Sequence, residues 1–318
     1  MNEYKKGDKV ATRDAYGEAL AKLGEIHEDI VVLDADLAKS TKSIVFGKKF
    51  PERFRYIGIS EADMVSMAAG LARCNKVPFV SSFASFLINR ALDQIKVSIA
   101  YSETNVKIVG SHGGIMTGQD GPTGQSILDL AIMKCMPKFK VCTPSDYYES
   151  IACTFELYET KGPTYMRTCR EKTEIIHEKK VEFKFGKAEV LKEGKDASII
   201  SCGPIITEAL KASEDLEKIG YSVSVLNCAS LKPIDEKAIE KEAKKGIILS
   251  LEDGVVQGLG GSIAEIIAEK KLNTKLIRLG LKDSFAESGN AKELLEKYKM
   301  DSKAITERLL QEIKKERK

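Results

Sequence analysis

Seven polar side chains in the N-terminal half follow predicted buried strands, and their types suit acid–base chemistry and anion binding. Carboxyl groups and imidazole hold or accept protons, while guanidinium and hydroxyl groups bind phosphate-like anions. In a parallel α/β sheet the carboxyl ends of the strands meet at one edge, so such residues are expected to converge there. They are Asp36, Ser40, Glu61, His112, Asp120, Arg167 and Arg170.

Glu61 stands in residues 56–70, which read YIGISEADMVSMAAG. Residues 56–59 are predicted to form a short strand, and the small and apolar residues after Ser60 a helix. A carboxylate that follows a serine also suits an ordinary helix N-terminus. Position alone therefore leaves Glu61 either a first-turn carboxylate or a functional one.

His112 is the histidine best suited to a site, because it lies among glycines in a predicted loop, GSHGG. His27 and His177 have charged neighbours and are predicted to face solvent, and three histidines do not support a histidine-rich metal site. The GLGGS run at 258–262 resembles a phosphate loop only weakly, so we predict a tight turn that packs a helix against its strand. The sequence contains no G-x-S-x-G elbow, H-E-x-x-H motif or Walker A loop.

The elements that position these residues alternate between strands and helices. In the first half the expected strands are 30–33, 56–59, 77–83, 106–109, 140–143 and 164–167, and the expected helices are 12–23, 86–98 and 127–134. The glycine-rich residues 116–125 are expected to be a loop. This alternation predicts a mostly parallel sheet covered on both faces.

The same rhythm restarts after a polar, charged stretch at 171–187, which we predict to be a linker. The expected strands are then 197–201, 222–227, 246–251 and 275–279, and the expected helices 206–219, 262–269 and 302–315. The sequence thus predicts an α/β fold with two domains, 1–170 and 188–318, each a mostly parallel sheet flanked by helices.

Composition limits the class of protein. The 318 residues allow about two domains, and 43% hydrophobic with 31% charged residues indicates a soluble globular chain. A net charge of +3 with scattered lysines argues against nucleic acid as a partner, and the lack of a long apolar run argues against a membrane. Seven cysteines without a C-x-x-C pair predict reduced, core-filling thiols in a cytoplasmic protein.

Several separated motifs together resemble the second half of transketolases. They are EADMVSMAAGLA from Glu61, SFASFLINRALDQI from Ser82 and GSHGGIMTGQDGPTGQ from Gly110, with ATRDAYGEAL and YMRTCR in matching order and spacing. The resemblance spans essentially the whole chain. It implies a pyrimidine-binding domain followed by a transketolase C-terminal domain.

The resemblance implies thiamine diphosphate as the cofactor and gives Glu61 a catalytic role. A carboxyl group at this position hydrogen-bonds the cofactor's aminopyrimidine, and an apolar slot would hold its proton to a higher pH than water does. Phe83 and Phe86 match aromatic residues that stack on that ring. Asp36 matches a carboxylate near the cofactor and a subunit interface, whereas a third ring of some transketolases falls near Asn89.

Four positions match residues that hold a sugar phosphate, and the resemblance also implies a catalytic role for one of them, His112. They are Arg13, Ser40, His112 and Arg170. Asp120 matches an aspartate that accepts a hydrogen bond from a substrate hydroxyl. Gly124 departs from the family, which usually has histidine or glutamine there, so a contact is lost unless Gln125 or a water replaces it. The four phosphate-binding positions imply that the donor is a phosphorylated or otherwise anionic ketose.

The G-D-G…N motif with which transketolases hold Mg²⁺ and the diphosphate is not found in the sequence. The resemblance therefore implies a second chain that carries the Mg²⁺ ligands, an α₂β₂ assembly and no metal site here. The expected reaction moves a two-carbon ketol unit from a ketose to an aldose. Two alternatives stay open: the β subunit of a 2-oxo-acid dehydrogenase-type decarboxylating component, disfavoured by the phosphate-binding positions, and a non-catalytic subunit, disfavoured by Glu61, His112 and Asp120.

Overall fold

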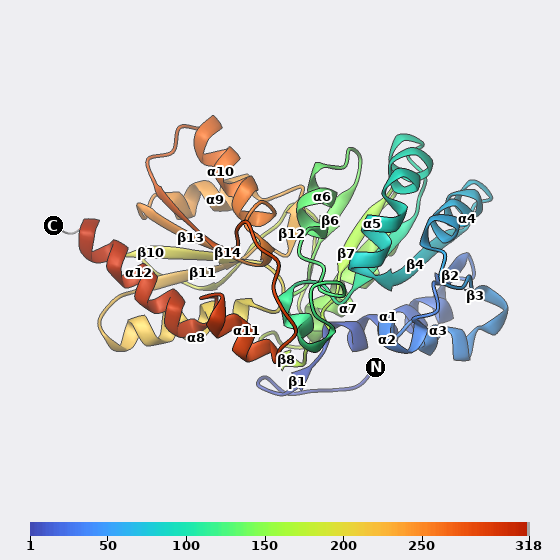
Figure 1. Ribbon diagram of the computed structural model, residues 1–318, viewed down its shortest axis with the longest axis horizontal. Helices are drawn as coiled ribbons and strands as arrows, with labels where there is room; N and C mark the ends of the chain where they lie inside the picture. Colours follow the sequence, from blue (N-terminus) through green and yellow to red (C-terminus); the bar gives the residue numbers. More distant parts are fainter. Residues whose placement is uncertain (317–318) are drawn as a thin grey trace.

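The computed structural model describes residues 1–316, in which two α/β units lie side by side (Figure 1). The larger sheet has the strand order β12-β6-β7-β5-β4-β2-β3, and only β12 runs antiparallel to its neighbour. Its strands are β2 Ile30–Asp34, β3 Phe54–Tyr56, β4 Val77–Phe83, β5 Lys107–Ser111, β6 Lys140–Cys142, β7 Thr164–Arg167 and β12 Ser230–Lys232.

The second sheet has the order β14-β13-β10-β11-β9, with β9 antiparallel to β11. Its strands are β9 Glu189–Lys192, β10 Ala197–Ser201, β11 Val223–Asn227, β13 Ile247–Val255 and β14 Lys275–Leu281. Two short strands, β1 Lys9–Val10 and β8 Thr173–Glu174, pair with each other. The predicted fold class, two units with mostly parallel sheets flanked by helices, is confirmed.

Helices cover both sheets (Figure 1). Beside the first sheet, α1 Thr12–Ile26 packs on α3 Ile44–Lys49 and α7 Tyr147–Glu159, while α4 Glu61–Arg73 packs on α5 Ala84–Gln94 and the π-helical turn η2 Ile95–Tyr101. Beside the second, α8 Ile206–Lys218 packs on α12 Ser302–Glu316, and α9 Glu236–Ala243 on α10 Leu259–Glu269. The remaining helices are α2 Ala38–Thr41, η1 Pro51–Arg53, η3 Ile115–Asp120, α6 Asp129–Cys135 and α11 Ala291–Lys297.

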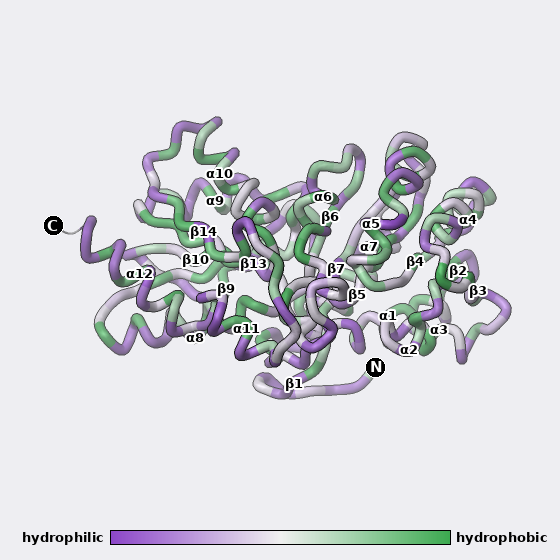
Figure 2. Tube along the Cα trace, in the orientation of Figure 1, coloured by the Kyte–Doolittle hydropathy of each residue, from purple (hydrophilic) through white to green (hydrophobic). Residues whose placement is uncertain are grey.

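Hydrophobic residues run along strands of both units (Figure 2), and neighbouring residues on the central strands are buried in opposite layers, as expected for strands covered on both faces. Leu33, Val80 and Ile108 belong to the core under α4 and α5, which continues beneath α9 and α10 of the second unit. Val32, Phe79 and Val109 belong to the core under α1 and α7. The sheet is therefore held rigidly, and its carboxyl ends are fixed.

Three local predictions differ from the structure. The strand expected at 56–59 is wrong, because β3 ends at Tyr56 and Gly58 turns the chain with φ +84°. The expected loop at 116–125 contains the short helix η3. Cys74 and Cys135, expected in the core, are exposed at the ends of α4 and α6, although the other five cysteines are buried.

The two units are joined by more than a linker. The strand β12 comes from the second half of the chain but pairs with β6 in the first sheet. The strand β8 lies within the predicted linker and pairs with β1. The boundaries at 170 and 188 stay a prediction. No helix within residues 1–316 is both long and apolar enough to cross a membrane.

Candidate functional site

The candidate site lies at the carboxyl ends of neighbouring parallel strands. Phe83 ends β4 opposite Ser111 at the end of β5, and Asp34 ends the adjacent β2. Glu61 is the first residue of α4, and Arg13 lies in the first turn of α1. Segments far apart in the sequence thus deliver their polar residues to one edge of the sheet, as the strand pattern predicted.

Glu61 is buried at this edge, with 3% of its surface exposed. Arg90 Nη1 donates hydrogen bonds to both carboxylate oxygens, at 3.1 Å to Oε1 and 3.2 Å to Oε2. Ser82 Oγ lies 3.5 Å from Oε1. The carboxylate therefore has a single charged partner, which approaches from the solvent side, since 46% of the Arg90 side chain is exposed.

Aromatic rings form a continuous strip beside Glu61. His112 stacks on Phe83 with ring centroids 3.7 Å apart, and Phe83 stacks on Phe86 at 5.4 Å. The Arg90 guanidinium lies 4.1 Å from the centroid of Phe86, so it covers both this ring and the Glu61 carboxylate. The strip offers flat apolar faces next to a buried carboxylate, which is a suitable surface for a planar heterocycle.

His112 is held in a left-handed backbone conformation, with φ +62°. Such strain is uncommon outside glycine and concentrates at functional sites. Gly113 and Gly114 follow because a Cβ there would meet Arg167 Nε at 2.2 Å and Asp253 Oδ2 at 1.9 Å. The glycines of this loop are therefore required by close packing, and they aim the His112 ring at the rim.

The protonation state of His112 follows from its neighbours. Arg13 Nη1, which can only donate, lies 3.2 Å from His112 Nε2, so Nε2 accepts and Nδ1 carries the proton that it donates to Ser111 Oγ at 2.8 Å. Burial, together with the positive charges of Arg13 and Arg170, lowers the pKa of His112 to about 3. The imidazole is therefore neutral at physiological pH.

Two guanidinium groups converge beside His112. Arg13 Nη1 also donates to the carbonyl oxygen of Ser40 at 3.0 Å, while Arg13 Nε is buried without a hydrogen-bond partner in the described chain. Arg170 Nη1 donates to Asp120 Oδ1 at 2.5 Å, and both side chains are partly exposed. The two arginines lie close enough to lower the pKa of Arg13, although burial contributes more to that shift. An unpartnered buried donor between positive charges favours an anionic ligand.

The loop that carries Asp36 and Ser40 is anchored by a buried carboxylate. Asp34 accepts hydrogen bonds from Leu37 N at 2.7 Å and from the hydroxyls of Thr41 and Ser43 at 2.8 Å each. Burial nevertheless raises the pKa of Asp34 to about 6. Asp36 itself is exposed two residues after the end of β2, with φ +64°.

Gly124 and Gln125 close the other side of the site. A Cβ on Gly124 would lie 2.8 Å from the Cβ of Asp120, so a larger residue here would displace that aspartate. The amide of Gln125 already donates to the carbonyl oxygens of Gly118 and Glu287, each at 3.0 Å. Gln125 therefore does not replace the donor that Gly124 lacks. A cavity of about 340 Å³ lies here, between Phe86, Arg90 and Phe285 of the second unit.

Three polar side chains lie in other surroundings than the sequence predicted. Arg167 is buried in an ion pair with Asp129 at 2.6 Å and does not reach the rim. His177 is buried between Asp146 and Glu189 and does not face solvent. His27 is partly exposed and stacks on Tyr158 at 3.9 Å. In each case an acidic or aromatic residue distant in sequence supplies the packing partner.

The run at 258–262 packs a helix against its strand, as predicted. It opens α10, where the first free backbone N–H groups, those of Leu259 and Gly260, donate to the carboxylate of Glu252 on β13 at 2.9 and 2.8 Å. The protein's own carboxylate thus fills the position of a phosphate.

Arg90 is the residue that sequence reasoning missed. The signal was present, because Arg90 lies four residues after Phe86 on one predicted helix and so shares its face. What the sequence did not contain was the position of Glu61, which comes from the preceding helix.

Comparison with known proteins identifies the family. The model of the transketolase pyrimidine-binding domain matches residues 8–175, and that of the transketolase C-terminal domain matches residues 186–305. This chain belongs to the transketolase family. The assignment from the sequence to a transketolase C-terminal section is thereby confirmed, and membership implies the use of thiamine diphosphate.

Relatives of similar length support this placement in the transketolase family. The chain is 45% identical over 307 residues to a putative transketolase C-terminal section of Methanocaldococcus jannaschii, covering 96% of each. It is 37% identical over 295 residues to the 6-deoxy-6-sulfo-D-fructose transketolase subunit SqwH of a Clostridium species, covering 92% of this chain and 91% of that one. By contrast, it spans about half the length of the mouse and human transketolases that it matches, 49% and 50%.

A solved structure has the same arrangement of domains. It is described as a split gene transketolase in an inactive β4 tetramer. It superposes with a TM-score of 0.89 at 38% identity, covering 96% of this chain and 99% of that chain.

Proposed function

We propose that this chain forms the pyrimidine-binding half of a two-chain transketolase, which transfers a two-carbon ketol unit from an anionic ketose to an aldose. The observation that carries the proposal is the buried carboxylate of Glu61 beside the stacked rings of Phe83 and Phe86, in a domain that matches the pyrimidine-binding model. His112, Arg13, Ser40, Arg170 and Asp120 would form the substrate side of the same rim, with Asp36 at its edge.

The residues at the rim fit a planar cofactor next to Glu61. Phe83 and Phe86 provide a ring face, and Glu61 provides a buried carboxyl group that can hydrogen-bond a ring nitrogen. Arg90 covers both, but its side chain is half-exposed and can turn toward solvent. When bound, thiamine diphosphate supplies the nucleophilic carbon, whereas the protein supplies orientation and proton control.

We assign the Mg²⁺ ligands and the diphosphate contacts to a separate chain, in an α₂β₂ assembly. Two observations support this assignment. Relatives that this chain covers almost completely are named a C-terminal section and a subunit. The solved relative made of one chain type is described as inactive.

The anionic end of the donor would bind between Arg13 and Arg170. Arg13 Nε is buried and unpartnered, and Arg170 would exchange Asp120 for the ligand. Once Arg13 turns to the anion, the lone pair of neutral His112 Nε2 that now accepts from Arg13 would accept from a sugar hydroxyl, as would the carboxylate of Asp120. The relative named for a sulfonated fructose makes both phosphate and sulfonate candidates for the anion.

The cofactor assignment is tested with two variants, each reconstituted with the diphosphate-binding chain from the same genome. Glu61→Gln should lower turnover by about a thousandfold while thiamine diphosphate still binds, because the variant lacks the carboxyl proton. Arg90→Met should bind the cofactor up to about fivefold more tightly, because no ion pair has to break. Binding is followed by calorimetry. An active Glu61→Gln complex would remove the assignment, and tight binding by this chain alone would remove the split site.

The anion site is tested with Arg170→Met and three donors: fructose 6-phosphate, 6-deoxy-6-sulfofructose and fructose. Loss of a charge-assisted hydrogen bond should raise KM for the preferred anionic donor about 10- to 100-fold and leave the weak reaction with fructose nearly unchanged. Wild-type kcat/KM values rank phosphate against sulfonate. An equal loss for all three donors would contradict the anion site.

A further inference from the structure

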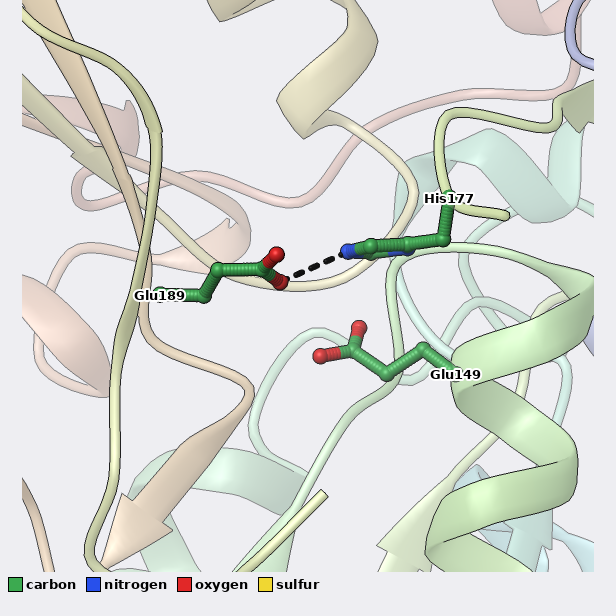
Figure 3. A group of neighbouring side chains, drawn as sticks. All are labelled: Glu149, His177 and Glu189. Carbon is green, nitrogen blue, oxygen red and sulfur yellow. Dashed lines mark hydrogen bonds and ion pairs between the residues drawn. The ribbon is translucent and has the colours of Figure 1, made fainter. Parts of the chain in front are cut away.

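Three acidic or basic side chains, none of them among the rim residues, meet at the junction of the two units. They are Glu149 on α7, His177 between β8 and β9, and Glu189 at the start of β9. One ligand-type atom from each lies within 4.8 Å of the others. Figure 3 shows the three side chains pointing toward one another from separate segments. A cavity of about 420 Å³ opens beside Glu149 and Glu189.

The ring of His177 has a carboxylate at each nitrogen, an arrangement that suits a metal-binding histidine. Its Nε2 lies 2.8 Å from Glu189 Oε2, while its Nδ1, on the far side, lies 3.0 Å from Asp146 Oδ2 without a well-aligned hydrogen bond. A carboxylate behind the non-ligating nitrogen fixes the tautomer and the ring orientation of such histidines. Asp146 is fixed in turn, because it accepts from the backbone N–H groups of Glu149, Ile176 and His177 at 2.9, 2.9 and 2.7 Å.

Glu149 is also held in place by neighbours that leave it acceptor capacity. Its Oε2 accepts from Ser145 N at 2.7 Å and Ser145 Oγ at 2.5 Å, and its Oε1 accepts from Asn227 Nδ2 at 2.8 Å. A carboxylate has about four acceptor positions, so one remains. Asn227 is 1% exposed, and its Oδ1 has no hydrogen-bond partner in the described chain. An unpartnered oxygen thus lies beside the group.

Among the groups in direct contact at the junction, acidic side chains outnumber basic ones. Asp146, Glu149 and Glu189 surround one imidazole, which neutralises one negative charge at most. The lysines Lys180, Lys184 and Lys187 also line the cavity, but Lys184 pairs with Glu156, and within residues 1–316 no lysine lies within ion-pair distance of Glu149 or Glu189. A buried carboxylate without a counter-charge is costly, and Glu149 is only 3% exposed. A bound cation would remove this cost.

We propose that Glu149, His177 and Glu189 bind a divalent transition-metal ion, with water completing its coordination, at the junction of the two units. One imidazole nitrogen and two carboxylate oxygens suit Zn²⁺, which we take as the probe. Because the ligands come from α7, from β9 and from the segment between them, the ion would tie the two units together. The site is independent of the Mg²⁺ assigned to the partner chain and of the proposed reaction.

The test uses the full chain with Cys74→Ser and Cys135→Ser, because exposed thiols also bind zinc. After removal of metals by a chelator, Zn²⁺ is titrated by calorimetry and Co²⁺ by its visible absorption. We expect one ion per chain with a micromolar or lower Kd and a raised Tm. Glu189→Gln should weaken binding at least about tenfold, and it is suitable because Glu189 is half-exposed and not needed in the core.

Glu182→Gln is the matched control, because Glu182 is exposed at the same cavity but outside the three ligands. It should bind Zn²⁺ as the parent does. Two results would overturn the proposal. One is that the parent does not bind Zn²⁺ at ~100 μM, a concentration about 100 times a micromolar Kd. The other is that the parent and Glu189→Gln bind Zn²⁺ equally. Binding that disappears once the two cysteines are replaced would assign the zinc to the thiols and also overturn it.

Discussion

His112 is the residue whose charge state is most firmly set by its surroundings. It is buried against Phe83 and faces Arg13 from α1 and Arg170 from the segment after β7, so both burial and charge oppose protonation. A neutral imidazole suits a site for anionic sugars, because Nε2 then accepts a hydrogen bond while the two arginines hold the negative charge. Its neutrality also has a consequence for stability.

The pKa of His112, about 3 when folded, lies below the ordinary value of 6.5, so the unfolded chain binds a proton that the folded chain does not. The free energy of unfolding should therefore fall as pH drops below 6.5, by about 2 kcal/mol between pH 6.5 and 5 from this residue. Urea unfolding of wild type and His112→Gln at these pH values measures this change in the free energy of unfolding. His27→Gln is the control, because His27 is partly exposed. Equal pH slopes in wild type and His112→Gln would contradict it.

At the scale of single residues, position after a strand predicted that Glu61 and His112 would meet at one edge, whereas Phe83 and Phe86 were expected there only from the family resemblance. Glu61, Phe83, Phe86 and His112 converge because the strand ends of a parallel sheet must meet. Arg90 and the buried state of His177 could not be predicted, since each depends on a carboxylate from another helix or strand. Residue type indicates that a charge needs a partner, but not which partner the fold supplies.

At the scale of elements, the link between the two units depends on Arg167 at the end of β7. Its Nη2 donates to Asp129 Oδ1 on α6 at 2.6 Å and to the Ser126 carbonyl oxygen at 2.5 Å, and its Nη1 donates to the Asp253 carbonyl oxygen on β13 at 2.7 Å. The Asp253 carboxylate accepts from Ile115 N and Met116 N at the start of η3, which follows His112. One buried guanidinium thus joins three elements behind the rim.

Arg167→Met should destabilise the protein by about 3–5 kcal/mol, because it leaves Asp129 buried without its counter-ion. This loss is a large part of the free energy of unfolding of folded domains, which is typically roughly 5–15 kcal/mol. Urea unfolding at pH 7 measures it. Arg308→Met is the control, since Arg308 pairs with Glu312 on the partly exposed α12 and should change stability by less than about 1 kcal/mol. Similar losses in the two variants would show that the Arg167 network is not special.

The elements themselves could be predicted only where hydrophobic period and length were clear. The helix α7 was missed although SDYYE carries a capping signal: Asp146 accepts from Glu149 N, and Glu149 reaches back to Ser145 N. The strand expected at 56–59 failed because a glycine turns the chain there. The strand β12 was missed because it pairs with a sheet formed mostly by the other half of the chain.

At the scale of the whole molecule, one face carries apolar residues that no part of the described chain covers. Ile59 lies just before α4, Met67 on α4 and Tyr101 at the end of η2, and they are 75%, 42% and 87% exposed. The helix α4 lies at the end of the molecule away from the second sheet (Figure 1). Exposed apolar residues on neighbouring helices are typical of a subunit interface. We therefore expect the diphosphate-binding chain to bind over this face, where it would also enclose the cofactor.

Met67→Glu should weaken association with the diphosphate-binding chain at least about tenfold, because a carboxylate would be buried in an apolar contact. Its own folding should be unchanged, since Met67 is solvent-exposed on α4 in the single chain. Sedimentation velocity of the mixed chains measures association, and thermal unfolding checks the fold. Ile219→Glu is the matched control, because Ile219 is an exposed apolar residue after α8 of the second unit. If Met67→Glu assembles as well as wild type, the interface lies elsewhere; if both variants fail to assemble, the loss reflects added charge and not this face.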